Sequence, residues 1–442
     1  MERILLLLMI VLSGCKDNYY DDIKKYIDSL KIVDSHEHQR TPGDSADFRF
    51  FNTSYFENDL RDAGLRDFDR PLTGGFNTDS LWEHVGKYYN YSRALSSHAQ
   101  MMNYLRILYG YDKPYVEKSD LPGLYRQMIA NHYKNYNTWF DKVYHEENFE
   151  TMLQDQYWDR FNTNIDTDYF KLVCNVHECI SLVGEAATNK KIVSSESLLR
   201  FMGKKEVLIN NLDDYTNLID TVLNTAKRKG AVCIKNTAAY FRTLEFEDVD
   251  SNVARGIFDK SGALTAQDKK KLEDYVFHNI IKRSIDLDLP IQIHTGYLAG
   301  LGSRIDNGQP MKLINLFIRY PTAKFMLFHG GYPWTGDFVV LGKQFSNVYL
   351  DLVWLPQLSM TSAIYTLHEM LDAVPYNKIL WGGDVGRIDD AVGSLELAKE
   401  VVATVLSERV EKGWMTKELA HDIAKHIFHD NAIELFHLKL HE

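Results

Sequence analysis

Short apolar runs that alternate with helical stretches constrain the fold of this chain more than any other feature. Eight runs have the length and composition of buried strands, at residues 31–38, 170–176, 197–202, 231–235, 290–294, 323–329, 348–352 and 378–382. Helical patterns separate most of them, at residues 213–229, 266–287, 311–320, 337–345 and 362–373. Strands that alternate with helices form parallel sheets, so eight such units predict an α/β fold closed as a (β/α)₈ barrel.

An open, doubly wound sheet is the competing fold, but no glycine-rich nucleotide loop follows any of the runs. Residues 45–168 carry helical patterns instead of a clear strand, at 81–91, 97–109, 121–140 and 148–161. This stretch is too long for a simple loop, and we interpret it as a helical insertion after the first strand. Two further helical stretches, at 391–412 and 416–436, are expected to cover the wall and floor of the barrel.

The N-terminus has the pattern of a processed leader. Arg3 precedes an apolar run at residues 4–12, which is too short to span a bilayer. The run ends in Leu-Ser-Gly-Cys, which resembles a bacterial lipobox and implies lipid attachment at Cys15. We therefore expect residues 1–15 to be a signal peptide, 16–30 a tether and first helix, and 31–442 the barrel of a membrane-anchored lipoprotein in the bacterial cell envelope. The alternative is a buried N-terminal helix.

The composition limits the classes of partner that the protein is expected to bind. The formal net charge of −11 argues against nucleic acid, which selects basic surfaces. Four cysteines in 442 residues do not form a disulfide scaffold. A small-molecule substrate is the expected partner, and the sequence leaves open whether the protein forms a homo-oligomer.

Polar side chains close several of the predicted strands. Catalytic groups of a barrel enzyme lie at the carboxyl ends of its strands. His36 and His38 are two residues apart on a strand, so they face the same side and can bind one metal ion. The other strand-end residues are Lys235, His294, His329 and Asp384.

These residues, in this order, resemble the amidohydrolase superfamily, and in particular its amidohydrolase-related branch, which contains hydrolases and a decarboxylase. The likeness is carried by KNTAAYFR at 235–242, HTG at 294–296, HGGYPW at 329–334 and NVYLD at 347–351. It implies a distorted (β/α)₈ barrel of the metal-dependent hydrolase type.

The resemblance also implies a site. One Zn²⁺ or another divalent ion would be held by His36, His38, His294 and Asp384. Asp384 would accept the proton of the metal-activated water, and His329 would polarise the substrate carbonyl.

Lys235 leaves two readings of the metal count. In binuclear relatives the equivalent lysine is carboxylated and bridges two ions, which would make His294 and His329 ligands of the second. We favour one ion, with Lys235 and Arg242 binding a substrate carboxylate and Tyr240 shaping the pocket.

The function implied is hydrolysis of a C–N or C–O bond, in an amide, lactone or ester of a small, carboxylate-bearing substrate. The first alternative is a metal-dependent nonoxidative decarboxylase. The second, from a different class, is a noncatalytic lipoprotein that captures a ligand.

Overall fold

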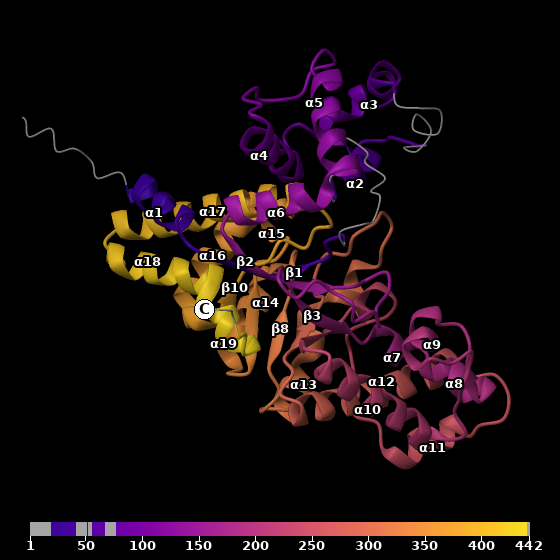
Figure 1. The fold of residues 1–442 in the computed structure, drawn as a ribbon. Helices are drawn as coiled ribbons and strands as arrows, with labels where there is room; N and C mark the ends of the chain where they lie inside the picture. Colours follow the sequence, from indigo (N-terminus) through magenta and orange to yellow (C-terminus); the bar gives the residue numbers. More distant parts are fainter. Residues whose placement is uncertain (1–18, 41–50, 52–54, 67–76, 440–442) are drawn as a thin grey trace, which may run out of the picture.

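The computed structural model describes residues 19–40, 51, 55–66 and 77–439 (Figure 1). The predicted signal peptide and Cys15 lie outside the described residues, so lipid attachment stays a prediction. Within the described ranges, no helix is long and apolar enough to cross a membrane.

Eight parallel strands form a sheet that is nearly closed into a barrel, which confirms the predicted fold class. In spatial order they are β1 (Ile32–Glu37), β2 (Phe149–Asp155), β3 (Phe170–Asn175), β6 (Ala231–Asn236), β7 (Ile291–Ile293), β8 (Phe325–Leu327), β9 (Val348–Asp351) and β10 (Ile379–Leu380). The first and last strands meet through backbone hydrogen bonds, from Ser35 N to the Trp381 oxygen (3.2 Å) and from Asp384 N to the His36 oxygen (2.9 Å). A separate antiparallel pair joins β4 (Lys191–Ile192) and β5 (Val207–Leu208).

One predicted strand is wrong. Residues 197–202 lie in the helix α9 (Glu196–Met202), whose N-terminus is capped by the Ser195 side chain, which accepts from Leu198 N. The second barrel strand is β2, inside the stretch 148–161 that the sequence predicts to be helical. The strand is decided by tertiary pairing, because β2 forms parallel ladders with β1 on one side and β3 on the other.

Helices between β1 and β2 form the insertion: α2 (Phe56–Asp62), α3 (Thr78–Ser92), α4 (Ser96–Tyr109), α5 (Leu121–Ile129) and α6 (Tyr136–Glu146). A π-helical turn at Ala130–Lys134 divides the single helix predicted at 121–140. In Figure 1, α2–α5 stand together above the barrel, and α6 lies beside α17. A buried hydrogen bond inside this unit runs from the Tyr89 hydroxyl to His98 Nε2 (2.9 Å).

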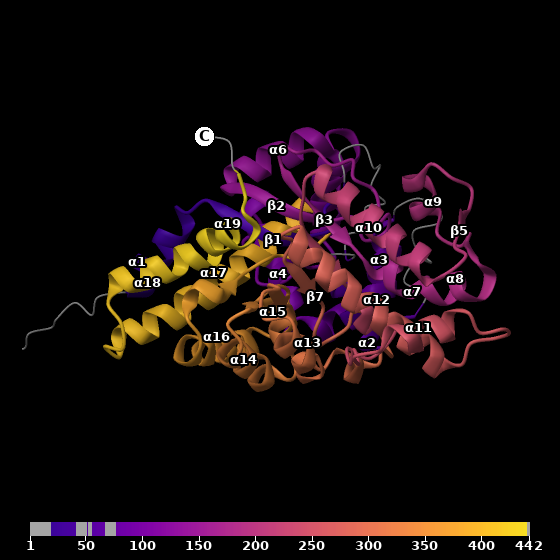
Figure 2. The ribbon, with the colours of Figure 1, turned by 90° about the horizontal axis from the view of Figure 1, so that it is seen from below.

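The remaining helices surround the barrel: α1 (Tyr19–Asp28), α7 (His177–Ser181), α8 (Val183–Asn189), α10 (Leu212–Arg228), α11 (Ser251–Phe258), α12 (Ala266–Asp286), α13 (Ile314–Arg319), α14 (Thr335–Gln344), α15 (Leu355–Leu358), α16 (Met360–Ala373), α17 (Ile388–Glu411), α18 (Lys417–Lys425) and α19 (Asn431–Phe436). Figure 2 shows α1, α17 and α18 packed along one side. The barrel interior is filled by an apolar cluster that includes Val33, Leu153 and Cys233 of the strands and Leu435 and Phe436 of α19.

The long helix α17 is buried for most of its length and contacts α1, α4 and α16. Gly393 of α17 faces α4, and a Cβ atom added there would overlap the backbone oxygen of Gln100. Glycine is therefore required for the close approach of the two helices, which attaches the insertion to the element that follows β10.

Candidate metal centre

Three side chains from the two ends of the chain converge at the carboxyl ends of the strands. In the described part of the chain, His36, His38 and Asp384 form a group in which one ligand atom of each residue lies within 4.8 Å of the others. His38 Nε2 is 3.1 Å and His36 Nε2 is 3.8 Å from Asp384 Oδ1. The backbone bonds that join β1 to the segment after β10 set this arrangement.

Neighbouring acceptors determine which nitrogen of each imidazole carries a proton. Gln292 Nε2 donates to the Ser35 oxygen (2.9 Å), so its Oε1 faces His36 and accepts from His36 Nδ1 (3.0 Å). The backbone oxygen of Asp155 accepts from His38 Nδ1 (2.9 Å). With the Nδ1 atoms so engaged, both Nε2 atoms face Asp384, and in the neutral rings they would supply, together with its carboxylate, three ligand atoms for one divalent ion.

The carboxylate and the imidazoles of the group shift one another's pKa values toward the charged forms. Burial disfavours ionisation of Asp384, but its hydrogen bond to His38 and the charges of both imidazoles hold its pKa below the usual value. Burial lowers the pKa of His38, but the bond to Asp384 outweighs it and leaves that pKa raised. In the Gly-Gly-Asp segment, a Cβ at Gly383 would overlap the Glu37 carboxylate, so glycine allows the backbone to approach β1 closely.

Lys235 lies beside this group and is 1% exposed. Its Nζ is 3.3 Å from His36 Nε2 and 3.4 Å from the centre of the Phe328 ring. Burial lowers the pKa of Lys235 to about 8, against the opposing effects of Asp384 and Asp155. Lys235 is not among the residues that line the cavity described below, so its expected contact with substrate stays a prediction.

His294 and His329 form a separate buried pair. His329 Nε2 lies 3.0 Å from His294 Nδ1, and His294 Nε2 contacts the Tyr297 oxygen at 2.8 Å. The other nitrogen of His329 contacts the Val353 oxygen at 3.1 Å. Burial lowers the pKa of both rings, that of His329 to about 4. The structure thus brings together three of the four predicted ligands and places His294 next to His329.

Arg242 lies away from the group. Its guanidinium forms ion pairs with Asp274 and with Glu273 (3.0 Å) and stacks on Phe246, at 4.7 Å from the ring centre. It is therefore engaged with the protein's own carboxylates on α12. Its predicted role toward a substrate carboxylate is not one that this placement supports.

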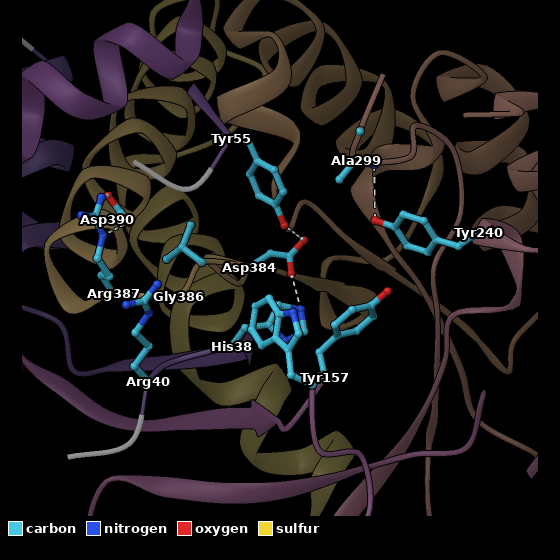
Figure 3. A pocket seen from close by; sticks show the side chains of 13 residues that line it. His38, Arg40, Tyr55, Tyr157, Tyr240, Ala299, Asp384, Gly386, Arg387 and Asp390 are labelled. Carbon is cyan, nitrogen blue, oxygen red and sulfur yellow. Dashed lines mark hydrogen bonds and ion pairs between the residues drawn. The ribbon is translucent and has the colours of Figure 1, made fainter. Parts of the chain in front are cut away.

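A cavity of about 540 Å³ opens beside His36, His38 and Asp384, which we call the metal group (Figure 3). It is lined by His38, Arg40, Tyr55, Tyr157, Trp158, Tyr240, Ala299, Gly300, Asp384, Val385, Gly386, Arg387 and Asp390. The Tyr55 hydroxyl donates to Asp384 Oδ2 at 3.4 Å, and the Tyr240 hydroxyl accepts from Ala299 N at 3.3 Å. The volume is that of a pocket for a small molecule.

Several residues of the site do not follow from the sequence pattern. Asp155 is missed because its strand reads as a helix. Gln292 shares a strand face with His294, which is the signal that points to it. Arg40 follows His38 by two residues, and the same alternation applies to it. Tyr55 comes from the insertion, where no local signal links it to the barrel.

Comparisons with known proteins agree with this fold. Residues 258–438 match the family model described as Amidohydrolase. Protein fluG of Emericella nidulans is 30% identical over 151 residues, which are 34% of this chain and only 17% of that relative.

Solved structures match over nearly the whole chain. Uronate isomerase from Thermotoga maritima has a TM-score of 0.74 at 14% identity, covering 95% of this chain and 97% of its own. Glucuronate isomerase from Caulobacter crescentus has a TM-score of 0.72 at 14% identity, covering 96% and 95%. A protein assigned as a metal-dependent hydrolase from Lactobacillus casei has a TM-score of 0.62 at 16% identity, covering 94% and 97%. At these identities the likeness establishes the fold.

Proposed function

We propose that this protein is a metal-dependent hydrolase that cleaves an amide, lactone or ester bond of a small, carboxylate-bearing substrate. The observation that supports the proposal best is the group of His36, His38 and Asp384, whose ligand atoms lie within 4.8 Å of one another beside a cavity of about 540 Å³. The match of residues 258–438 to the Amidohydrolase model agrees with it.

His36, His38 and Asp384 would hold the ion. When bound, a divalent ion in such a site supplies Lewis acidity for the carbonyl and for water. The chain's own residues do the rest of the work. Asp384 accepts the proton of the attacking water and returns it to the leaving group. The Tyr55 hydroxyl orients the Oδ2 atom of Asp384 for this transfer, at 3.4 Å.

The remaining walls of the cavity position the substrate and exclude water. Tyr240 is held against the 299–300 segment by its bond to Ala299 N. The rings of Tyr157 and Trp158 lie beside His38, with their centres 5.7 and 6.0 Å from its imidazole. Aromatic walls of this kind bind apolar or sugar faces of a substrate through contact area.

The experiment has two parts. Metal content of the purified chain lacking residues 1–15 is measured by mass spectrometry, and about one equivalent is expected. The zinc-loaded protein is then screened against dipeptides, lactones, acyl-amino acids, aromatic acids and uronates. Accumulation of an acid with uptake of one water supports the proposal. Release of CO₂ would replace it with the decarboxylase alternative, and isomerisation of a uronate without water uptake would also overturn it.

We also propose that the protein is anchored to the bacterial envelope through a lipid on Cys15. The support is the leader pattern of residues 1–15. Membrane fractionation and labelling with radioactive palmitate should give a labelled wild type and an unlabelled, soluble Cys15→Ala variant. A labelled variant would contradict the assignment.

A further inference from the structure

We propose that Arg40 binds the carboxylate of the substrate, on one side of the reacting bond. The inference rests on the proposed function, because it assumes that the reacting bond lies at the metal group. It assigns substrate recognition to a residue of the first strand's extension instead of to Arg242.

Arg40 is placed by the same extended segment that carries a metal ligand. His38 N donates to the Val385 oxygen (3.0 Å) and Arg40 N to the Gly386 oxygen (3.1 Å), so the two residues extend the pairing of β1 beyond its end. Two residues of extended chain span about 6.6 Å. Arg40 therefore enters the cavity close to the metal group but beyond reach of the ion itself.

The guanidinium of Arg40 differs in its contacts from those of Arg387 and Arg242. Arg387 is 6% exposed and forms a two-point ion pair with Asp390, at 2.9 and 3.1 Å. Arg242 is paired with two carboxylates of α12. Arg40 is partly buried, and among the residues that the structure describes none forms an ion pair or side-chain hydrogen bond with its guanidinium. A partly buried guanidinium that lines a cavity can form charge-assisted hydrogen bonds to the carboxylate of a bound molecule.

Charge is distributed unevenly in the cavity. In Figure 3, Arg40, Arg387 and Asp390 lie on one side of Asp384, while Tyr240 and Ala299 lie on the other. Of the lining residues on the first side, two are arginines and one is a carboxylate, in a protein whose formal net charge is −11. A local positive site on an acidic protein selects an anionic group and orients it.

The arrangement therefore defines a substrate class. The molecule is a short acid in which the carboxylate binds Arg40, the reacting carbonyl lies at His38 and Asp384, and an uncharged part extends toward Tyr240 and Ala299. Arginine suits this role because its planar donors match a carboxylate at two points.

Isothermal titration with simple acids tests the assignment. The probes are succinate, glutarate and adipate, each compared with its monoamide, so that one carboxylate is available to the metal group in both members of a pair. For the diacid of best-fitting length, the zinc-loaded wild type should bind about tenfold tighter than to the monoamide, the gain expected of one charge-assisted contact. Arg40→Met should reduce this ratio to about one, and Arg40→Lys should retain part of it.

Arg200→Met is the matched control, because Arg200 is exposed on α9 and pairs with Asp159 outside the cavity. It should keep the wild-type ratio, and thermal denaturation checks that each variant is folded. An equal affinity of the wild type for diacid and monoamide at every length would overturn the inference, as would an Arg40→Met variant that keeps the preference. Titration of the metal-free protein with Zn²⁺ separates the two proposals. Failure to bind zinc counts against the hydrolase, whereas loss of the diacid preference counts only against the role of Arg40.

Discussion

The proton position on each imidazole of the metal group is determined by a residue that does not itself bind metal. Gln292 Oε1 holds the Nδ1 proton of His36, and the Asp155 backbone holds that of His38. Such partners keep the ligand nitrogen aimed at the ion, and their loss weakens metal binding. Gln292 and the backbone of Asp155 therefore support the metal group from behind its two histidines.

Gln292→Leu should lower zinc affinity about 10- to 100-fold, because His36 loses the acceptor that orients its ring. Competition with a chromophoric chelator measures the change. Gln292→Glu keeps an acceptor at the same place and should retain affinity within about threefold of the wild type. Unchanged affinity in the leucine variant would show that the contact does not support the site.

Tyr55→Phe should lower kcat about tenfold or more while metal content and KM change little, because the hydrogen bond that the hydroxyl forms among the described residues goes to the proton-accepting oxygen of Asp384. Steady-state kinetics on the substrate found in the screen, together with metal analysis, measure the two effects. A variant that instead loses metal would assign Tyr55 to the support of the ion.

At this scale the sequence predicts His36, His38 and Asp384, because each closes a strand and carries a ligand group. It does not predict that His294 turns to His329 and the Tyr297 oxygen, since both partners depend on the path of the chain after the strands. Arg242 illustrates the same limit. Its motif is present in the sequence, but carboxylates of α12, which begins 24 residues later, bind its guanidinium.

At the scale of secondary structure elements, a glycine allows two helices to pack closely. The helices α4 and α17 pack where Gly393 meets the backbone of Gln100. The insertion therefore depends on a residue of the element that follows the last strand.

Gly393→Ala should destabilise the protein by about 1–3 kcal/mol, because the added methyl group overlaps backbone that cannot move aside without separating the two helices. Chemical denaturation gives the free energy of unfolding. Gly256→Ala in α11 is the matched control, since no atom lies within 4 Å of the added Cβ, and it should be neutral or stabilising by up to about 1 kcal/mol. Equal effects of the two substitutions would argue against the tight contact.

The insertion should lose stability in mild acid because of His98. The Tyr89 hydroxyl donates to His98 Nε2, which requires the neutral ring, and burial lowers the pKa of His98 to about 4 from 6.5. The unfolded chain then binds the proton more readily, so the stabilisation is complete above pH 6.5 and is lost as the pH falls toward 4. Thermal melts of wild type and His98→Gln should converge between pH 7 and pH 4.5, by about 2–3 kcal/mol at most. A constant difference across this range would contradict the titration.

Element prediction succeeds where a run is long and its period clear, as for α10, α12 and α17, and it fails for two short apolar runs. Residues 149–155 and 197–202 have apolar spacings that suit a helix or a strand. Hydrogen-bonded ladders to β1 and β3 make residues 149–155 a strand. The Ser195 cap helps to make residues 197–202 a helix. The count of eight strands is right because the two errors compensate.

At the scale of the whole molecule, one buried carboxylate binds several parts of the insertion at once. Asp389, at the start of α17, accepts from the Tyr109 hydroxyl (2.5 Å) and from Trp139 Nε1 (3.0 Å), and it lies 3.1 Å from His132 Nε2. These partners come from α4, α6 and the π-helical turn between α5 and α6. Asp389 thus ties three parts of the insertion to the helix that borders the cavity.

Asp389→Asn should lower the free energy of unfolding by about 2–4 kcal/mol, because an amide group puts donors where donors already point. Limited proteolysis should then cut within the insertion before the barrel. The control variant Asp248→Asn, in an exposed ion pair with Arg319, should change the free energy of unfolding by less than about 0.5 kcal/mol and leave the order of cleavage unchanged. Uniform cleavage in both variants would show that Asp389 does not couple the two parts.

The joining of the first strand to the segment after the last one has a consequence for how the protein is made. A ribosome releases His36 and His38 before Asp384, which follows His38 by 346 residues. Two imidazoles alone would not complete the proposed ligand set, so a nascent chain that lacks Asp384 would not hold the ion. An ion held by these three residues would therefore bind only after Asp384 has been synthesised, in the compartment where the barrel closes.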